Sequence, residues 1–514
     1  MTTADTVLGI DLGTSSVKAA VYGFDGVMLG SAERPVGLHH PAPGRAEQDL
    51  DEFYTAAAAA GRECLTAAGV GGGRVGAFAV AGQMAGVGLV DAQLRPVAPF
   101  DSWLDTRCGD VVDEIAQRVG ARVTSVAGCP PTLSIGPKMV WWRRNRPDVC
   151  AEAAAFVTAA GYVAARAVGR AGDAAFIDPT HLHFTAVADV ARARWDEDLV
   201  DAVGVEARML PQVVESTAVV GVLTRVAAAD FGLLPGTPIA AGCGDTAAAA
   251  LGSGVTEPGQ AFDVAGTAAV LGVCLPEFAP DRAASTLMTM RAALPGRWYS
   301  LAYVSGAGQV IEWLCREILG YPDLTAEAYT ELARVAAQAP AGSDGVILSP
   351  HFAGRVAPAD PGMRGSATGL SPGTGRAHLA RAALESIAYE YRGYAELATA
   401  AGGPPLTEVV GTGGGSRLGL WNQIKADVLG VPYRPLPTTD TGTRGAALVA
   451  LAAIGEPLPD EGPLGLGTIA EPDPTSTAAY DDAYARYRRW SGRLADGYRE
   501  ETDADRAFQR RGRI

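Results

Sequence analysis

Two glycine-threonine turns constrain this 514-residue chain more than any other feature. The first is Gly13-Thr14 and the second is Gly266-Thr267, and each joins two strand-like apolar runs. A strand, a tight turn and a second strand present backbone N–H groups and a hydroxyl that suit a phosphate. Asp11 and Asp263 precede the two turns and are candidate magnesium ligands. The repeat predicts two similar lobes that hold the phosphates of one nucleotide from opposite sides, so we expect an ATP-using enzyme.

Length and composition favour a large soluble enzyme. At 514 residues, 48% of them hydrophobic, the chain is long enough for two domains with real cores. We place the division at Gly252, which gives an N-terminal lobe of residues 1–252 and a C-terminal lobe of residues 253–514. The net charge of −15 argues against a nucleic-acid partner, because such partners require a basic face.

The cysteines and the N-terminus bear on the compartment. The seven cysteines form no Cys-x-x-Cys pair, which predicts buried free thiols in a reducing environment and disfavours a zinc site. The N-terminus has no apolar leader, and no uncharged apolar run approaches the ~20 residues of a membrane span. We therefore expect a cytoplasmic protein that does not bind membranes.

Strands and helices alternate along the chain, which predicts an α/β protein. The tail from Tyr498 to Ile514 is rich in charge and is predicted to be a solvated helix end or disordered. Strands are expected at Val7–Ile10, Val17–Tyr22, Val75–Val80, Ile239–Ala241 and Glu408–Val410, and helices at Leu50–Ala68, Asp110–Val119, Pro137–Arg146, after Gly308 and at Ala377–Ala400.

Several common motifs are absent or stand in the wrong context. No Gly-Lys pair occurs, which excludes a Walker A loop. Gly71, Gly73 and Gly76 have dinucleotide-binding spacing, but a helix precedes them and a strand follows. His181 and His183 are two residues apart, and without a third ligand they favour a surface or substrate-loop role over a metal pair.

Three segments in order resemble the FGGY carbohydrate kinases, and the pattern is xylulokinase-like. They are Asp11-Leu12-Gly13-Thr14 with Lys18, residues 81–86 (Ala-Gly-Gln-Met-Ala-Gly) and residues 242–248 (Gly-Cys-Gly-Asp-Thr-Ala-Ala). Weaker matches follow at Lys138–Asn145 and Gly369–Glu385. The resemblance implies an actin-like ATPase fold, with two RNase-H-like lobes and a cleft between them.

The resemblance also implies catalytic roles. Asp245 would be the general base that takes a proton from a sugar hydroxyl. The alternative is that Asp245 caps a helix, as Asp often does where a strand leads into a helix. Asp11 would hold Mg²⁺ through water, with simple turn chemistry as its alternative.

Nucleotide contacts are implied in both halves of the chain. Thr14 and Thr267 would offer hydroxyls and neighbouring N–H groups to phosphates, and residues 413–416 resemble the adenosine-binding loop. Lys18 either screens the transferring group or pairs with a surface acid, and the sequence favours neither. The predicted cofactor-binding residues are Asp11, Gly13, Thr14, Lys18, Gly266, Thr267, Gly308, Gly413, Gly414, Gly415, Ser416 and Asn422.

The sugar side departs from xylulokinases at two positions. This chain has Ala85 where they usually carry a histidine, and Thr246 where they usually carry asparagine after the catalytic aspartate. Met84 and Trp103 are equally compatible with core positions. The predicted substrate-binding residues are Gln83, Met84, Trp103, Asp105, Asp245 and Thr246.

Together these features predict an ATP- and Mg²⁺-dependent sugar kinase. The γ-phosphate would pass to a hydroxyl of a ketose, such as the pentulose xylulose, or of a related polyol. The alternatives are an actin-like ATPase without a sugar substrate and a sugar-binding regulator without kinase activity. The expected partner is a small-molecule sugar or polyol, and a homodimer is a candidate assembly.

Overall fold

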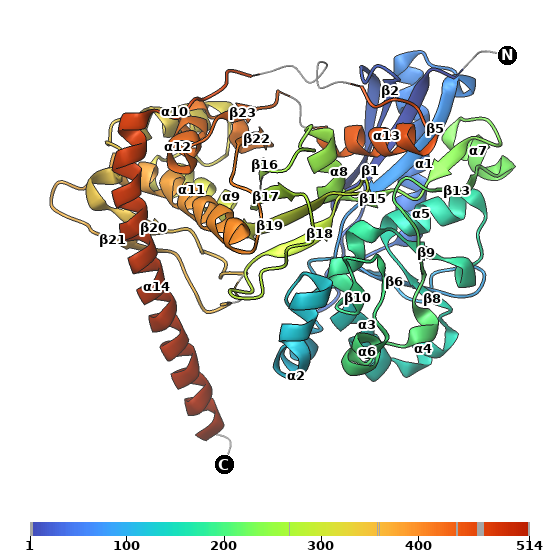
Figure 1. The fold of residues 1–514 in the computed structure, drawn as a ribbon, viewed down its shortest axis with the longest axis horizontal. Helices are drawn as coiled ribbons and strands as arrows, with labels where there is room; N and C mark the ends of the chain where they lie inside the picture. Colours follow the sequence, from blue (N-terminus) through green and yellow to red (C-terminus); the bar gives the residue numbers. More distant parts are fainter. Residues whose placement is uncertain are drawn as a thin grey trace.

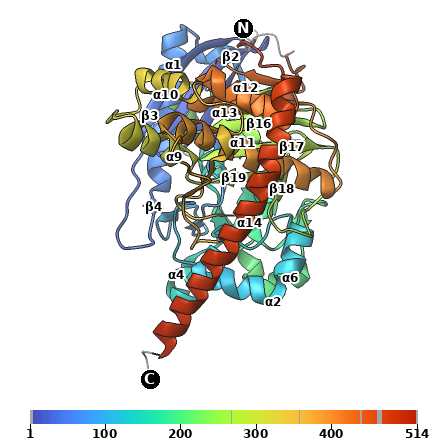
Figure 2. The ribbon, with the colours of Figure 1, turned by 90° about the vertical axis from the view of Figure 1, so that its left-hand side faces the viewer.

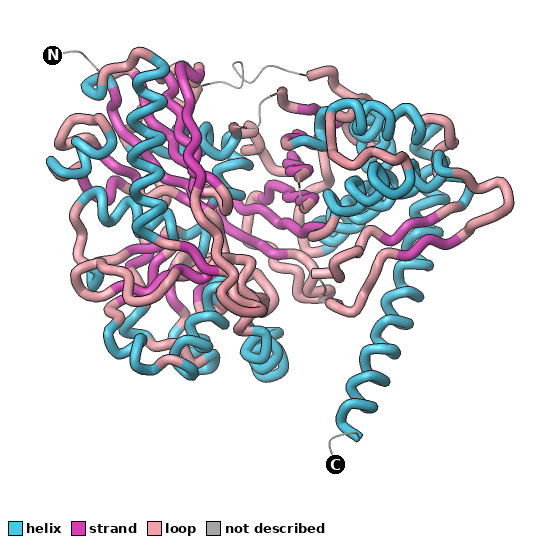
Figure 3. Tube along the Cα trace, turned by 180° about the vertical axis from the view of Figure 1, so that it is seen from behind, coloured by secondary structure: helices cyan, strands magenta, loops and turns pink. Residues whose placement is uncertain are grey.

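Two lobes, each built on a mixed β-sheet with helices on its faces, make up the fold (Figure 1). The computed structural model describes residues 4–266, 268–356, 358, 360–437, 440–459 and 467–511. Seen from behind, the strands of the two sheets lie in the two halves of the molecule, with helices around them (Figure 3). The lobe with the N-terminal strands also carries the small sheets and helices inserted between β5 and β14.

The N-terminal sheet has the strand order β13-β14-β5-β1-β2-β3, and β15 also pairs with β5. β1 and β2 form an antiparallel hairpin around the first Gly-Thr turn, whereas β5 runs parallel to β1. The strands are β1 (Thr6–Leu12), β2 (Ser16–Gly23), β3 (Met28–Pro35), β5 (Val75–Gly82), β13 (Val219–Val222), β14 (Pro238–Ala240) and β15 (Cys243–Gly244).

The C-terminal sheet repeats this arrangement, with the order β18-β19-β17-β16-β22-β23. β16 and β17 form an antiparallel hairpin, and β22 runs parallel to β16 as β5 does to β1. The predicted duplication of lobes is confirmed by this match. The strands are β16 (Gln260–Ala265), β17 (Ala269–Leu275), β18 (Met288–Arg291), β19 (Trp298–Val304), β22 (Glu408–Thr412) and β23 (Tyr433–Pro435).

Short strand pairs extend both lobes. In the N-terminal lobe, the pairs β4–β7, β6–β8, β9–β12 and β10–β11 surround the segments that carry the predicted sugar contacts. Their bounds, with those of the C-terminal pair β20–β21, are β4 (Glu47–Gln48), β6 (Gly88–Val90), β7 (Phe100–Asp101), β8 (Ala155–Val157), β9 (Phe176–Ile177), β10 (Ala188–Asp189), β11 (Arg194–Trp195), β12 (Gln212–Val213), β20 (Ile347–Ser349) and β21 (Ser366–Thr368).

Helices cover the sheets, and α1 shows why they begin and end where they do. The Asp49 side chain accepts the N–H of Asp51 at the start of α1, and Gly69 ends the helix in the left-handed conformation at φ 64°. The α-helices are α1 (Leu50–Ala68), α2 (Gly109–Ala127), α3 (Ile135–Asn145), α4 (Pro147–Glu152), α5 (Ala159–Val168), α6 (Glu197–Val203), α7 (Arg225–Phe231), α8 (Asp245–Gly252), α9 (Ala307–Trp313), α10 (Ala326–Ala336), α11 (Arg376–Ala400), α12 (Gly419–Leu429), α13 (Thr441–Ala453) and α14 (Pro474–Arg511).

Helix α13 lies outside residues 1–252 in the sequence but contacts the N-terminal lobe. It comes late in the sequence but packs on β1, β5 and α8 of the N-terminal lobe (Figure 1). The contact is close, because a Cβ atom on Gly445 would lie 1.9 Å from the carbonyl oxygen of Ala248. Helix α13 therefore contributes residues 441–453 to the packing of the first lobe, and the division at residue 252 stays a prediction.

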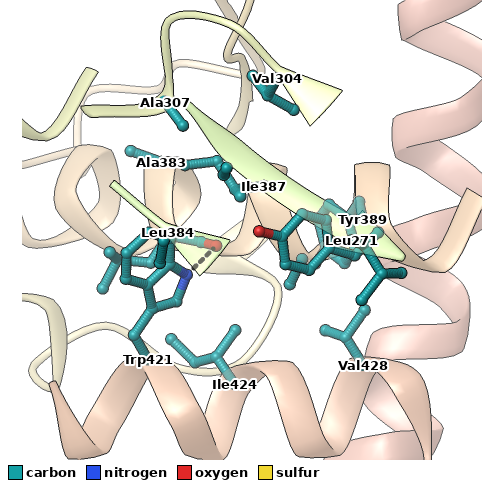
Figure 4. Packing of buried hydrophobic residues seen from close by; sticks show 14 of the residues in the cluster. Leu271, Val304, Ala307, Ala383, Leu384, Ile387, Tyr389, Trp421, Ile424 and Val428 are labelled. Atoms are coloured by element: carbon teal, nitrogen blue, oxygen red, sulfur yellow. Dashed lines mark hydrogen bonds between the residues drawn. The ribbon is translucent and has the colours of Figure 1, made fainter. Parts of the chain in front are cut away.

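Three large clusters of buried side chains stabilise the fold. One lies inside each lobe, and a third joins Val7 and Ala79 of the first sheet to Phe262 and Val410 of the second. Inside the C-terminal lobe, the indole of Trp421 packs among aliphatic side chains and donates to the carbonyl of Leu384 at 3.0 Å (Figure 4). The lobes therefore share apolar packing besides their chain connections.

The predicted strands and helices are confirmed, with two extensions. α2 runs eight residues beyond the predicted Val119, to Ala127. The charged tail is helical as far as Arg511, and the end of α14 extends beyond the rest of the molecule (Figure 2). Within the described residues, none of the helices combines the length and apolarity that crossing a membrane requires.

Candidate active site

The carboxyl ends of three neighbouring strands meet at one edge of the N-terminal sheet. Parallel pairing places Leu12 of β1 beside Gly82 of β5, and Gly82 beside Gly244 of β15. The N–H of Gln83 donates to the carbonyl of Leu12 at 2.9 Å. In open α/β sheets, this edge is where ligands bind. It brings the first Gly-Thr turn, the Gln83 segment and Asp245 together.

Asp245 is the first residue of α8 and is half-buried. Its Oδ1 accepts the N–H of Thr246 at 2.6 Å and the Thr246 hydroxyl at 3.1 Å. Burial raises the pKa of Asp245, although Thr246 and the nearby His181 oppose the shift. The N-cap residue of α8 is Gly244, so the geometry does not make Asp245 the helix cap. A carboxylate with a raised pKa at a ligand-binding edge suits a general base.

Asp11 lies against the start of α13. A Cβ atom on Gly442 would be 2.2 Å from Asp11 Oδ2, so any larger residue there would have to displace the carboxylate. Asp11 Oδ1 is buried and has no hydrogen-bond partner. Burial and the negative charges of Asp245 and Asp440 raise the pKa of Asp11 to about 7, against the opposing charge of Lys18. An unpartnered carboxylate oxygen among like charges fits a cation.

Lys18 pairs with Asp11 across the β1–β2 hairpin, and its ammonium lies 3.9 Å from a carboxylate oxygen of Asp440. Both side chains are about one-third exposed. The ammonium thus has an acidic partner, as one of the two alternatives for Lys18 expects, and it lies beside the first turn. Asp440 was missed in the sequence, although an acid directly before a Thr-Gly-Thr helix start is a recognisable signal.

Asp263 is not a magnesium ligand, which corrects the prediction for the second turn. Its side chain is fully buried. One oxygen accepts the Tyr391 hydroxyl at 2.6 Å, and the other accepts the Lys425 ammonium at 2.5 Å and the Tyr433 hydroxyl at 2.7 Å. With both oxygens engaged by these groups, Asp263 ties the second sheet to the helices that cover it.

Among the predicted sugar contacts, Gln83 and Met84 are buried, whereas Trp103 is exposed. Met84 packs against Gly244, directly before the predicted base, and Gln83 is buried between the Gln48 amide and the Ser102 hydroxyl. Trp103 is 42% exposed, and its indole N–H donates to Thr14 Oγ1 at 2.9 Å. Trp103 is therefore not a core residue, and it links the predicted sugar pocket to the first phosphate turn.

Asp105 does not face a substrate, which corrects its assignment. The carboxylate is fully buried, accepts the N–H of Ala46 at 2.9 Å and pairs with the guanidinium of Arg107. Arg107 also pairs with Glu47 at 2.5 Å and lies over the ring of Trp141. The role of Asp105 is to hold the loop that carries Trp103.

The predicted adenosine loop lies beside the second Gly-Thr turn. A Cβ atom on Gly413 would be 2.6 Å from the carbonyl of Ala265, which precedes Gly266. Ser416 donates to the carbonyl of Gly413, and the Asn422 amide donates to the carbonyl of Ser416. Gly414 and Gly415 lie in the same turn, Gly308 is in the first turn of α9, and Thr267 lies outside the described residues.

His181 is buried beside the site. Its Nδ1 lies 2.6 Å from Asp178 Oδ2, whereas its Nε2 has no hydrogen-bond partner. The neighbouring Thr180 hydroxyl accepts the N–H of Gly244 at 2.8 Å. The segment is therefore a support for the start of α8. His181 and His183 are both buried, so the surface role expected for them is wrong. Among the described residues no group of three or more acids, histidines and cysteines has the arrangement of a metal site.

Comparison with known proteins decides the family. Residues 6–252 match the N-terminal domain and residues 262–454 the C-terminal domain of the FGGY carbohydrate kinases. The chain belongs to the FGGY family of carbohydrate kinases. It is 31% identical to a glycerol kinase of Nitratidesulfovibrio vulgaris, over 87% of this chain and 90% of that protein.

Two xylulose kinases are also similar. One from Bacillus subtilis is 26% identical over 87% of this chain and 88% of its own length. The crystal structure of one from Rhodospirillum rubrum superposes with a TM-score of 0.87 at 28% identity, covering 96% of this chain and all of that one. The actin-like kinase fold predicted from the sequence is thereby confirmed, as is the assignment to carbohydrate kinases. Membership of a kinase family implies ATP use.

Proposed function

We propose that this FGGY kinase transfers the γ-phosphate of ATP to a hydroxyl of a ketose or a related polyol, with Asp245 as the general base. The observation that carries the proposal is the position of Asp245. Its carboxylate stands at the ligand-binding edge of the first sheet, next to Met84 and within electrostatic reach of Asp11. Phosphoryl transfer requires mainly positioning and charge stabilisation, which this group of strand ends supplies.

In this proposal, the base, the two Gly-Thr turns, the adenosine loop and Asp11 have different roles. Asp245 accepts the proton of the acceptor hydroxyl as the oxygen attacks. The N–H groups and hydroxyls of the two Gly-Thr turns hold phosphates, and residues 413–416 with Asn422 hold the adenosine. Asp11 would hold Mg²⁺ through water, and the bound ion would neutralise charge on the phosphates. The unpartnered Oδ1 of Asp11 supports this assignment.

The acceptor is proposed from the pocket rather than from any one relative. Relatives named glycerol kinase and xylulose kinase match the chain at similar significance, so similarity alone does not choose between a polyol and a ketose. Ala85 and Thr246 stand where xylulokinases usually carry larger polar groups. A missing hydrogen bond costs about 0.5–1.5 kcal/mol. We therefore expect D-xylulose to be a secondary substrate.

A coupled assay of ATP consumption over a panel of ketoses and polyols, with D-xylulose and glycerol included, tests the proposal. Acceptor-dependent ADP release with at least one of them is the expected result. A chain that binds ATP but transfers phosphate to none of the panel contradicts the proposed acceptor class. A catalytic efficiency for D-xylulose far above that for every other acceptor contradicts the altered pocket.

A further inference from the structure

Lys138 connects the two segments that carry the predicted sugar contacts. It lies on α3 and is fully buried. Its ammonium donates to the carbonyl oxygen of Ala85 at 2.9 Å and to that of Ser102 at 2.6 Å. Ala85 follows Met84, and Ser102 precedes Trp103. One ammonium group therefore holds both walls of the proposed acceptor pocket.

The segment that contains Ala85 has a backbone conformation that needs such support. Ala85 has φ 62°, in the left-handed region that residues with a Cβ atom disfavour. The next residue, Gly86, packs so closely on Phe100 that a Cβ atom would lie 2.4 Å from its ring. In this conformation the carbonyl of Ala85 accepts the Lys138 ammonium, and this hydrogen bond favours the backbone geometry that places Met84 against Gly244.

The charges around Lys138 explain why a cation is tolerated there. The neighbouring carboxylates of Asp101 and Asp105 favour the charged ammonium, while Arg107 opposes it. Burial outweighs the favourable charges and lowers the pKa of Lys138 to about 8. A lysine ammonium is compact, whereas the planar fork of arginine needs more room.

We propose that Lys138 is the positioning residue of the acceptor pocket, setting the relative placement of the Gln83–Met84 segment and Trp103 through the carbonyls of Ala85 and Ser102. The inference rests on the proposed function for the identity of the pocket. Lys138 does not touch the reacting atoms. It acts through the two segments, one of which reaches Thr14 through the indole of Trp103.

The kinetic test compares Lys138→Met and Lys138→Arg with the unmodified chain, using the best acceptor of the panel. Lys138→Met leaves both carbonyls without their donor, and the larger guanidinium of Lys138→Arg has to displace the two segments to fit, so we expect the acceptor KM to rise about tenfold or more in each, the equivalent of one lost hydrogen bond. The KM for ATP should change less than about twofold, because the nucleotide contacts are elsewhere. An unchanged acceptor KM, or equal losses for acceptor and ATP, overturns the proposal.

The dependence of the acceptor KM on pH supplies a second kinetic test. Above pH 8 the unmodified ammonium loses its proton, so the acceptor KM of the unmodified chain should rise with pH while the KM for ATP stays level. Lys138→Arg stays charged and should show an elevated acceptor KM without this pH dependence. A KM that rises with pH equally in both proteins overturns the assignment to Lys138.

Hydrogen exchange separates this inference from the proposed function, since it needs no acceptor. In Lys138→Met, amide exchange should increase in residues 83–86 and 101–107 and stay unchanged in α11 of the other lobe. Faster exchange throughout the N-terminal lobe would show a merely structural role and overturn the proposal. If no acceptor is phosphorylated by the unmodified chain, the proposed function fails, and the exchange pattern still decides the role of Lys138.

Discussion

The two Gly-Thr turns look alike in sequence, yet their acidic residues are in opposite chemical states. Asp11 has a buried oxygen without a partner and a pKa raised to about 7, whereas Asp263 has both oxygens bound by Tyr391, Tyr433 and Lys425. The first acid is available to a ligand, and the second is part of the core. The duplicated lobes therefore share topology without sharing chemistry.

A difference of one residue in spacing explains the contrast. Asp11 stands two positions before Gly13, and Asp263 stands three positions before Gly266. Side chains alternate between the faces of a strand, so the two acids leave their hairpins on opposite faces relative to the turn. Asp11 faces the start of α13, and Asp263 faces α11 and α12. Spacing within the motif decides which acid faces α13 and which is enclosed between the second sheet and its helices.

The largest effect is expected from Asp245→Asn, because Asp245 is the proposed base and lies in the same lobe as Asp11. The amide keeps the size of the side chain but removes its basicity, so turnover should fall by about 10²–10⁴-fold. Steady-state kinetics check this, with calorimetry to show that ATP and acceptor still bind. Near-normal turnover with unchanged thermal stability would end the assignment of Asp245 as base.

Asp263→Asn should damage stability instead of chemistry. The substitution leaves the buried ammonium of Lys425 without its counter-charge, and breaking such a pair costs about 3–5 kcal/mol. Chemical denaturation measures the loss, and the double variant with Lys425→Met serves as control because it removes the unpaired charge and should recover part of it. Full stability together with a lost Mg²⁺ dependence would reverse our comparison of the two acids.

Asp11→Asn should weaken the response to Mg²⁺. An outer-shell ligand typically contributes about 10–100-fold in metal affinity or activity. We therefore expect the Mg²⁺ concentration for half-maximal activity to rise by that order, without loss of stability, because a buried like-charged group has been neutralised. Titration of activity with Mg²⁺ at saturating ATP gives the measurement. A normal Mg²⁺ titration would assign Asp11 to turn geometry alone.

Measurements over a range of pH should separate the contribution of Asp11 to enzyme activity from its contribution to the free energy of unfolding. The ionised carboxylate is needed for function, so activity should fall as the pH drops through about 7. The folded-state pKa is raised, so the stabilisation from the protonated form is present below pH 4 and is lost as the pH rises through about 7. Burial raises the pKa of Asp101 to about 7 as well, so Asp101 contributes to the same loss of stability with rising pH. The Asp11→Asn variant should therefore show a smaller, but not zero, change of unfolding free energy with pH. The unfolding series is run without Mg²⁺, and an identical slope in the variant would contradict the shift at Asp11.

The smallest effects are expected from the turn threonines. Thr14→Val and Thr267→Val each remove a hydroxyl proposed to face phosphate, at a cost of about 0.5–1.5 kcal/mol. Both should weaken ATP use while sugar binding stays nearly normal, although Thr14→Val also removes the acceptor of the Trp103 indole. Calorimetry with each ligand compares them. Poor sugar binding with normal ATP binding in Thr267→Val would remove the second turn from the nucleotide site.

Predictions from sequence were good wherever the signal was local. Gly-rich turns after apolar runs locate the hairpins and the loop at residues 413–416, and the Asp-Thr after Gly244 locates the start of α8. Asp105 shows the limit, because an acidic residue near an exposed tryptophan does not reveal that Arg107 lies within reach of its carboxylate. Lys138 was noticed only as part of a family signature, since the carbonyls that it binds lie 53 and 36 residues away in the chain.

The sequence by itself determined the family, the repeated hairpins and the candidate base, because each depends on residues that are neighbours in the chain. Only the tertiary structure decided which acids are available and which are already paired. The partners of Asp263 come from α11, α12 and β23, and α13 crosses back to lie against Asp11. Charges and hydrogen bonds act through space, so the chemical state of a side chain follows from contacts that chain order does not reveal.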